Sequence, residues 1–218
     1  VPPADAVIAA DVLVAADVPA GGLAALRLEE GATKSARPMG RSSDTAIENE
    51  WLRVRFKAGA LEVYDKATRR TYAGLNVIEE EADRGDAWDF SEPWRPHPIL
   101  RSVDFPSTCR CVESGPVRAT LEIRTRMRVP RCLEGERRSR ATVELELVSR
   151  VSLCRGARRV DVALTFDNQA CDRRLRLNIA GYYNKFDDLA VTVPVATASP
   201  GVFGSRIINA GKVDYAGV

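Results

Sequence analysis

Apolar and polar residues alternate along much of this chain with a period of two, which is typical of β-strands that have one buried face. Three long segments of this kind predict strands at Ser102–Ser114, Val117–Val129 and Arg140–Cys154. Each is much longer than an average strand of roughly five or six residues. No helix longer than two turns is predicted, although Ala4–Ala10 is ambiguous. Shorter strands are expected at Val7–Val14, Leu23–Leu28, Trp51–Phe56, Ala60–Tyr64, Thr71–Glu79, Arg158–Phe166, Leu175–Ile179 and Leu189–Val195.

Turn residues separate these segments and indicate antiparallel pairing. Lys57–Gly59 joins two short predicted strands into a hairpin, and Asp65–Thr68 forms the next turn. Pro106 lacks a backbone N–H, so it should interrupt the strand predicted at 102–114 or place it at a sheet edge.

Long antiparallel strands with one apolar face predict an all-β fold, a large antiparallel two-sheet β-sandwich. No internal repeat, low-complexity tract or clear linker divides the chain. We therefore expect one domain over residues 1–218, with an irregular lead-in carrying edge strands at 1–45 and the main sandwich at 46–218.

Composition excludes several classes of function. The chain has 218 residues, 45% of them hydrophobic, and a net charge of only +2, which gives no electrostatic reason to bind nucleic acid. Arg124, Arg126 and Arg128 alternate with apolar or small residues, as on the outer face of a strand. No run of about 18 apolar residues indicates a membrane span, and no signal peptide is evident. The chain begins at Val1 without a methionine, as expected of a processed chain or a piece of a longer protein.

The five cysteines are scattered and odd in number, which favours reduced structural thiols in a cytoplasmic protein. Cys109 and Cys111 should share one face of a strand. We expect no metal site and no cofactor in this chain.

The segment Glu79–Trp94 combines two tryptophans, a phenylalanine and several carboxylates within what should be a long ordered loop at 82–98. Indole faces stack on the apolar faces of sugar rings, and carboxylates accept hydrogen bonds from sugar hydroxyls. Two alternatives stay open: the tryptophans may plug the end of the core, and the acids may cap turns and pair with arginines. The candidate contacts to a carbohydrate are Asp86, Trp88, Asp89, Trp94, Asp172 and Arg174.

The sequence offers few residues in patterns that are suited to catalysis. The single histidine, His97, lies between prolines, and no nucleophile-elbow sequence occurs. One histidine and dispersed cysteines do not predict a zinc site. A self-contained pair of catalytic carboxylates is not evident, so no residue is predicted to be catalytic.

Six segments, in order and at similar spacing, resemble the β-domain that follows the catalytic domain in glycoside hydrolase family 38, the α-mannosidases. The bacterial branch, which includes mannosylglycerate hydrolases, is most similar. The resemblance spans about Asp11 to Ile179, and no match is found beyond Gly181. The segments are Asp17–Gly22, Ile47–Leu52, Gly59–Lys66, Gly85–Phe90, Ser114–Ala119 and Asp167–Arg176.

The resemblance implies a sandwich of the supersandwich, galactose-mutarotase-like kind, packed in the same polypeptide against an N-terminal catalytic barrel. The barrel would carry the nucleophile, the acid/base residue and the zinc ligands. In relatives the loop matching Ala87–Phe90 approaches the substrate, and Trp88 takes the position of the aromatic contact. Asp86 matches the Gly–Asp of bacterial members. The family's Asp–His–Arg–Leu–Arg motif carries Arg173 in place of histidine, which puts a ligand role of that position in doubt.

The leading hypothesis is therefore a non-catalytic β-sandwich domain of a retaining, zinc-dependent α-mannosidase-like enzyme, inactive by itself and contributing contacts to a mannose-containing carbohydrate. The first alternative is a stand-alone carbohydrate-binding or interaction module. The second is a mutarotase-like or lyase-like enzyme, which His97 alone supports poorly.

Overall fold

The computed structural model describes residues 13–14, 16–27, 38–85, 90–179, 193–194 and 207–208. Within these residues the protein is all-β, apart from the 3₁₀ turn η1 (Ser102–Asp104), and no helix there is long and apolar enough to cross a membrane. The strands are β1 (Ser42–Ser43), β2 (Ala46–Glu48), β3 (Leu52–Lys57), β4 (Ala60–Asp65), β5 (Arg70–Ala82), β6 (Leu100–Arg101), β7 (Ser107–Ser114), β8 (Arg118–Pro130), β9 (Leu133–Glu134), β10 (Arg137–Arg138), β11 (Thr142–Cys154), β12 (Asp161–Phe166), β13 (Arg173–Ile179), β14 (Val193–Pro194) and β15 (Ile207–Ile208).

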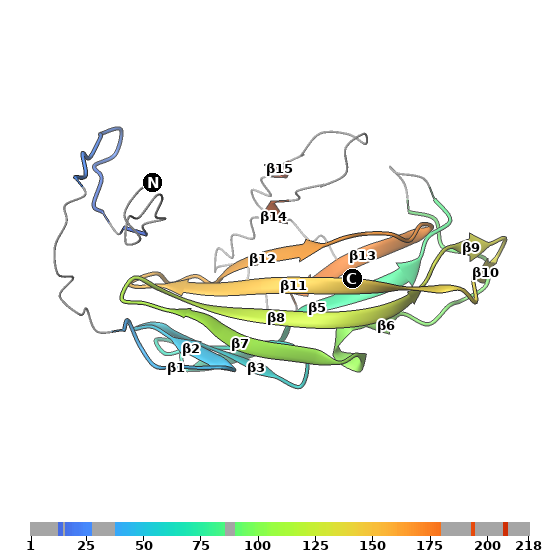
Figure 1. Cartoon of the computed structure of the whole chain (residues 1–218), viewed down its shortest axis with the longest axis horizontal. Helices are drawn as coiled ribbons and strands as arrows, with labels where there is room; N and C mark the ends of the chain where they lie inside the picture. Colours follow the sequence, from blue (N-terminus) through green and yellow to red (C-terminus); the bar gives the residue numbers. More distant parts are fainter. Residues whose placement is uncertain are drawn as a thin grey trace, which may run out of the picture.

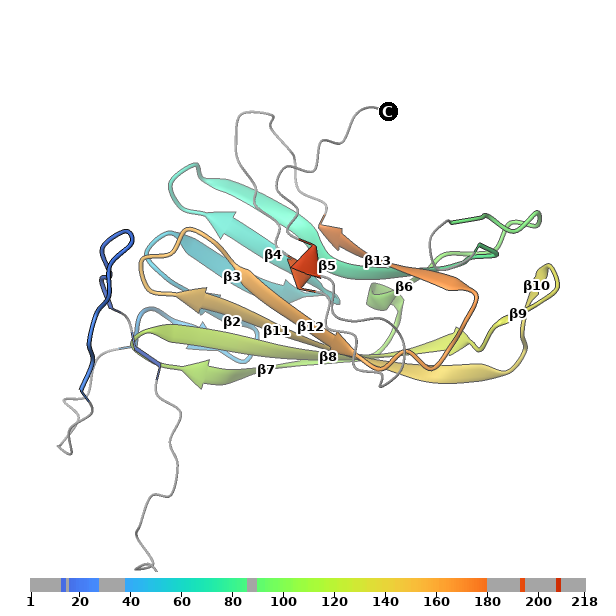
Figure 2. The same ribbon diagram turned by 90° about the horizontal axis from the view of Figure 1, so that it is seen from above.

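Two antiparallel sheets form the sandwich, and Figures 1 and 2 show their strands lying over one another. One sheet has the strand order β1-β2-β3-β4-β5-β13, with β6 paired to β5. The other has the order β12-β11-β8-β7. The antiparallel two-sheet sandwich predicted from the periodicity is confirmed.

The core lies between the sheets because each long strand presents one apolar face. Along β8, Met127 and Val129 are fully buried, whereas Arg124, Arg126 and Arg128 are exposed, as the alternation predicts. One cluster of buried residues joins β2, β3 and β4 to β8 and β11, and a second joins β5 to the other end of β8 and β11. The fully buried side chains that contribute most volume to these clusters are Ile47, Leu61, Leu121, Met127, Leu145 and Leu153.

The longest ladder in the fold pairs β8 with β11. Its register runs without a shift from Pro130 opposite Thr142 to Arg118 opposite Cys154. Beyond Pro130 the chain continues directly into the β9–β10 hairpin before it returns as β11. The hairpin is therefore an extension of the two central strands.

Asn49, in the turn between β2 and β3, connects the two layers. Its side-chain amide donates hydrogen bonds to the carbonyls of Cys154 and Ala157, both at 2.8 Å. Its side-chain oxygen accepts the N–H groups of Trp51 and Leu52 at 2.9 and 2.8 Å. All four hydrogen bonds of the buried amide are thus made within the protein.

Glu122 is buried, but it lies on the outer face of its sheet beneath three arginines. Its carboxylate accepts hydrogen bonds from Arg110, Arg124 and Arg150 at distances from 2.8 to 3.3 Å. The hydrogen bonds from Arg110, followed by those from Arg124, lower the pKa of Glu122 from 4.5 to about 2. The arginines, rather than the apolar core, shield this carboxylate from water.

The predicted strands correspond to β3, β4, β5, β7, β8, β11, β12 and β13, with differences at their ends. Pro106 comes directly before β7, which is an edge strand as predicted. The strand predicted at Leu23–Leu28 is wrong over the described residues 23–27, because no neighbouring strand pairs with them and Leu23 is 98% exposed. Most of Val7–Val14 and Leu189–Val195 lies outside the described residues.

Candidate functional site

Four segments meet at one end of the sandwich: the C-terminal end of β5, the loop at 83–99, the β9–β10 hairpin and the start of β13. Figures 1 and 2 both show the loop after β5 and the β9–β10 hairpin extending from this same end. Asp83, at the end of β5, donates its N–H to the carbonyl of Asp172 just before β13, at 3.0 Å. The register of β5 with β13 places Ala82 opposite Arg173.

Glu136, in the turn of the hairpin, binds the loop at three points. Its carboxylate accepts the backbone N–H of Trp94 at 2.8 Å and pairs with the guanidinium of Arg84 at 3.5 Å. Its backbone carbonyl lies 3.0 Å from Nε2 of His97. These contacts position the described part of the loop against the hairpin, and they assign His97 a partner in the scaffold.

Trp94 presents its side chain to solvent. The indole is 80% exposed, although the guanidinium of Arg84 lies over its ring at 4.8 Å from the centroid. The interpretation of Trp94 as a plug of the core is therefore wrong. Its backbone is fixed through Glu136 while its ring stays open, which is the arrangement that suits stacking on a ligand.

A second aromatic contact lies nearby, where β13 begins. The guanidinium of Arg174 is 3.5 Å from the ring centroid of Phe90, and its Nε donates to Glu81 at 2.7 Å. Arg176 also pairs with Glu81, at 3.0 Å. Arg174 is thus held by one carboxylate and one aromatic ring at the edge of the loop.

Beneath this surface lies a buried charged group that the sequence did not indicate. Strand β5 continues to Ala82, so the alternation turns Glu80 inward, where it pairs with Arg138 of the hairpin. Burial lowers the pKa of the neighbouring Arg173, and the Glu80 carboxylate acts in the opposite direction. Arg173 also donates to the side-chain oxygen of Asn168. The charged group ties the hairpin to β5 and β13.

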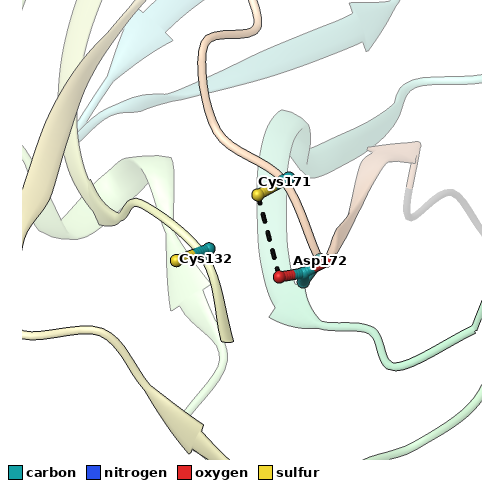
Figure 3. A group of neighbouring side chains, drawn as sticks. All are labelled: Cys132, Cys171 and Asp172. Carbon is teal, nitrogen blue, oxygen red and sulfur yellow. Dashed lines mark hydrogen bonds between the residues drawn. The ribbon is translucent and has the colours of Figure 1, made fainter. Parts of the chain in front are cut away.

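Asp172 serves the scaffold through its side chain. Its carboxylate accepts the N–H of Leu133, the first residue of β9, at 2.9 Å. Its φ of 54° is in the left-handed region, which aspartate adopts more often than most residues. Cys171 and Cys132 lie beside it, and the three ligand atoms are all within 4.8 Å of one another (Figure 3). Partial desolvation, followed by the Asp172 carboxylate and the Cys132 thiol, raises the pKa of Cys171.

Of the six carbohydrate contacts predicted from the sequence, the structure describes three. Asp86, Trp88 and Asp89 lie outside the described residues. Trp94 and Arg174 belong to the surface just described, whereas the Asp172 carboxylate is directed to the backbone of β9.

Sequence reasoning missed Arg84 and Glu136, which position Trp94. The sequence did contain one signal for Glu136. This residue lies in the turn that joins two of the long predicted strands, and such a hairpin extends beyond the sheet. The proximity of Cys132 and Cys171 had no local signal, because a long-range hydrogen bond from the N–H of Cys171 to the carbonyl of Arg131 holds the two segments together.

Comparison with solved structures bears on this fold directly. An α-mannosidase from Enterococcus faecalis V583 matches with a TM-score of 0.58 and 22% identity, over 66% of this chain and 18% of that protein. A glycosyl hydrolase family 38 protein from Enterococcus faecalis matches with a TM-score of 0.56 and 23% identity, over 72% of this chain and 20% of that protein.

The chain shares its fold with part of each of these proteins. The resemblance to family 38 noted in the sequence is confirmed at the level of fold. The matched region spans about a fifth of the length of either relative. No family model matches the sequence, and no curated protein does so either.

Proposed function

We propose that this chain is a β-sandwich domain of an α-mannosidase-like glycoside hydrolase, in which it supports a separate catalytic barrel and contributes contacts to an α-mannoside. The exposed indole of Trp94 carries this proposal. Glu136 accepts the backbone N–H of this residue and Arg84 lies over its ring, at the end of a sandwich whose fold recurs in an α-mannosidase.

The chemistry around Trp94 suits a sugar. An indole face packs against the C–H face of a pyranose ring, while carboxylates and guanidinium groups beside it exchange hydrogen bonds with hydroxyls. Arg84, Glu136 and Arg174 supply such groups within the same end of the sandwich. Apolar and polar contacts of this kind orient a ligand without any bond being made or broken.

The hydrolytic groups would come from the barrel. The whole chain has a single histidine, and that residue is engaged with the carbonyl of Glu136. A zinc-assisted glycosidase of the proposed type would hold its metal and its two carboxylates in that other domain. The present domain would close one side of the sugar site and hold the barrel in place.

Kinetics of the complete polypeptide test this proposal. Trp94→Ala should raise KM for an aryl α-mannoside about tenfold with little change in kcat, because the stacking contact forms in both the ground state and the transition state. The KM of Trp94→Phe should lie between that of Trp94→Ala and that of the wild type. Leu23→Ala, which removes an exposed apolar side chain outside this surface, is the matched control. Unchanged KM for Trp94→Ala would refute the proposed sugar contact.

The size of the natural protein separates the leading proposal from a stand-alone module. An antibody raised against this 23.9 kDa chain should detect a polypeptide several times larger in cell extracts. Detection of a protein of only that mass, which binds mannosides without hydrolysing them, would favour the stand-alone module instead.

A further inference from the structure

We propose that Cys132, Cys171 and Asp172 form a binding site for a thiophilic divalent cation such as Zn²⁺, at the point where the chain enters β13 (Figure 3). This site is separate from the sugar surface around Trp94, and the proposal does not depend on the proposed glycosidase role. It also departs from the expectation, drawn from the scattered cysteines, that the chain has no metal site.

The spacing of the three ligand atoms fits such an ion. All lie within 4.8 Å of one another, and Sγ of Cys171 is 3.7 Å from Oδ2 of Asp172. Zinc–sulfur bonds of about 2.3 Å in a tetrahedral site hold two sulfurs roughly 3.8 Å apart. Small side-chain adjustments would therefore bring the two sulfurs and one carboxylate oxygen to bonding distance around one ion.

The backbone holds the ligands in place before any ion arrives. The N–H of Cys171 donates to the carbonyl of Arg131 at 2.9 Å, which fixes the segment before β13 beside the segment after β8. The N–H of Leu133 donates to the Asp172 carboxylate, and the N–H of Asp83 donates to the Asp172 carbonyl. Hydrogen bonds to a ligating carboxylate orient it and are typical of metal sites that are preformed.

The donor set selects the class of ion. Two soft thiolates with a single hard carboxylate suit Zn²⁺ better than Mg²⁺ or Ca²⁺, because the latter two ions prefer several oxygen ligands. Cys171 and Asp172 are exposed, so an ion can reach the group from solvent. Binding would displace the thiol protons into the solvent, so affinity should fall as the pH is lowered. The fourth position would be open to water.

A bound ion would cross-link the β8–β9 connection to the start of β13. The first segment leads into the hairpin that carries Arg138, and the second leads into β13, which pairs with the β5 strand that carries Glu80. The ion would thus stiffen the base of the candidate sugar surface without touching the sugar.

Titration of the reduced full-length chain with Co²⁺ and then Zn²⁺ tests the site. We expect one Co²⁺ to bind with the near-ultraviolet absorption of cobalt–thiolate charge transfer, and Zn²⁺ to remove that absorption by displacement. Cys171→Ser and Cys132→Ser should each abolish the absorption. Asp172→Asn, which keeps an oxygen for the N–H of Leu133, should weaken binding at least tenfold.

Cys109→Ser and Cys154→Ser are the matched controls, since both alter half-buried cysteines outside the group. They should leave the cobalt spectrum unchanged. The same spectrum in Cys171→Ser would overturn the proposal, as would the absence of cobalt binding by a wild-type chain with free thiols. A Cys132–Cys171 disulfide in protein alkylated at the moment of cell lysis would also overturn it, in favour of a structural cross-link.

Discussion

The carboxylate of Glu80 is completely buried and pairs with the guanidinium of Arg138, which is itself only 11% exposed. The two residues come from β5 and from the hairpin that extends the central ladder. One oxygen of Glu80 and two nitrogens of the adjacent Arg173 have no hydrogen-bond partner among the described residues. The end of the sandwich that carries Trp94 thus rests on a small group of buried charges.

Replacing Arg138 should destabilise the protein strongly. Arg138→Met leaves Glu80 in the core without its closest counter-charge, and we expect a loss of about 3 kcal/mol in the free energy of unfolding. Urea denaturation measures it. Arg126→Met, which removes an arginine that is 67% exposed, should change stability by less than about 0.5 kcal/mol. Equal effects of the two substitutions would show that the buried pair does not stabilise the fold.

The stability of the protein should depend on pH through Glu122. Its pKa is lowered from 4.5 to about 2 in the folded state, so the folded protein holds the ionised form more strongly than the unfolded chain does. The resulting stabilisation is complete above pH 4.5 and disappears as the pH falls toward 2. Denaturant titrations of the wild type and Glu122→Gln across this range should therefore converge at low pH. Glu144→Gln, at an exposed carboxylate on the neighbouring strand β11, is the matched control.

Asn49→Asp should be far more harmful than its small change in shape suggests. The substitution replaces an N–H₂ group that donates to two carbonyls with an oxygen that repels them. We expect about 3 kcal/mol of destabilisation in thermal or chemical unfolding. Gln169→Glu makes the same chemical change at an exposed position, and an effect of similar size there would contradict the role of the buried amide.

Glu136→Ala should loosen the loop at 83–99, because only the contact of the residue 136 carbonyl with His97 remains. The Glu136 carboxylate accepts the Trp94 N–H and pairs with Arg84, and both contacts would be lost. Hydrogen exchange followed by mass spectrometry should speed up in peptides covering the loop, while β8 and β11 keep their protection. The KM for an α-mannoside should rise in the complete polypeptide. Unaltered exchange in the loop would indicate that other contacts position Trp94.

Local periodicity was sufficient to predict most of the sandwich. The alternation along β8 correctly separated buried Met127 and Val129 from exposed arginines, and the missing N–H of Pro106 correctly marked an edge. These features depend on neighbouring residues only. The prediction of a strand at Leu23–Leu28 was wrong because it ignored distant residues. An apolar segment forms a strand only where another strand pairs with it.

The candidate site was harder to predict because its contacts are long-range. The strand predicted at Thr71–Glu79 ended too early, because pairing with β13 extends β5 to Ala82 and turns Glu80 into the core. A separate hydrogen bond, from the N–H of Cys171 to the carbonyl of Arg131, brings Cys171 to Cys132, which is 39 positions earlier in the sequence. The aromatic and acidic composition of the loop drew attention to Trp94 as a candidate, but Glu136, which accepts the Trp94 N–H, belongs to the β9–β10 hairpin.

The attachment of the loop to Glu136 has a consequence for how this protein can change over generations. The contacts that anchor the loop to Glu136 are made by the Trp94 N–H, the Arg84 guanidinium and the His97 ring, whereas the Trp94 ring is 80% exposed and contacts only the Arg84 guanidinium among the contacts described above. Substitutions of the Trp94 side chain should therefore persist through evolution with little loss of folding stability. The sandwich thus holds a position at which the side chain can change independently of the core.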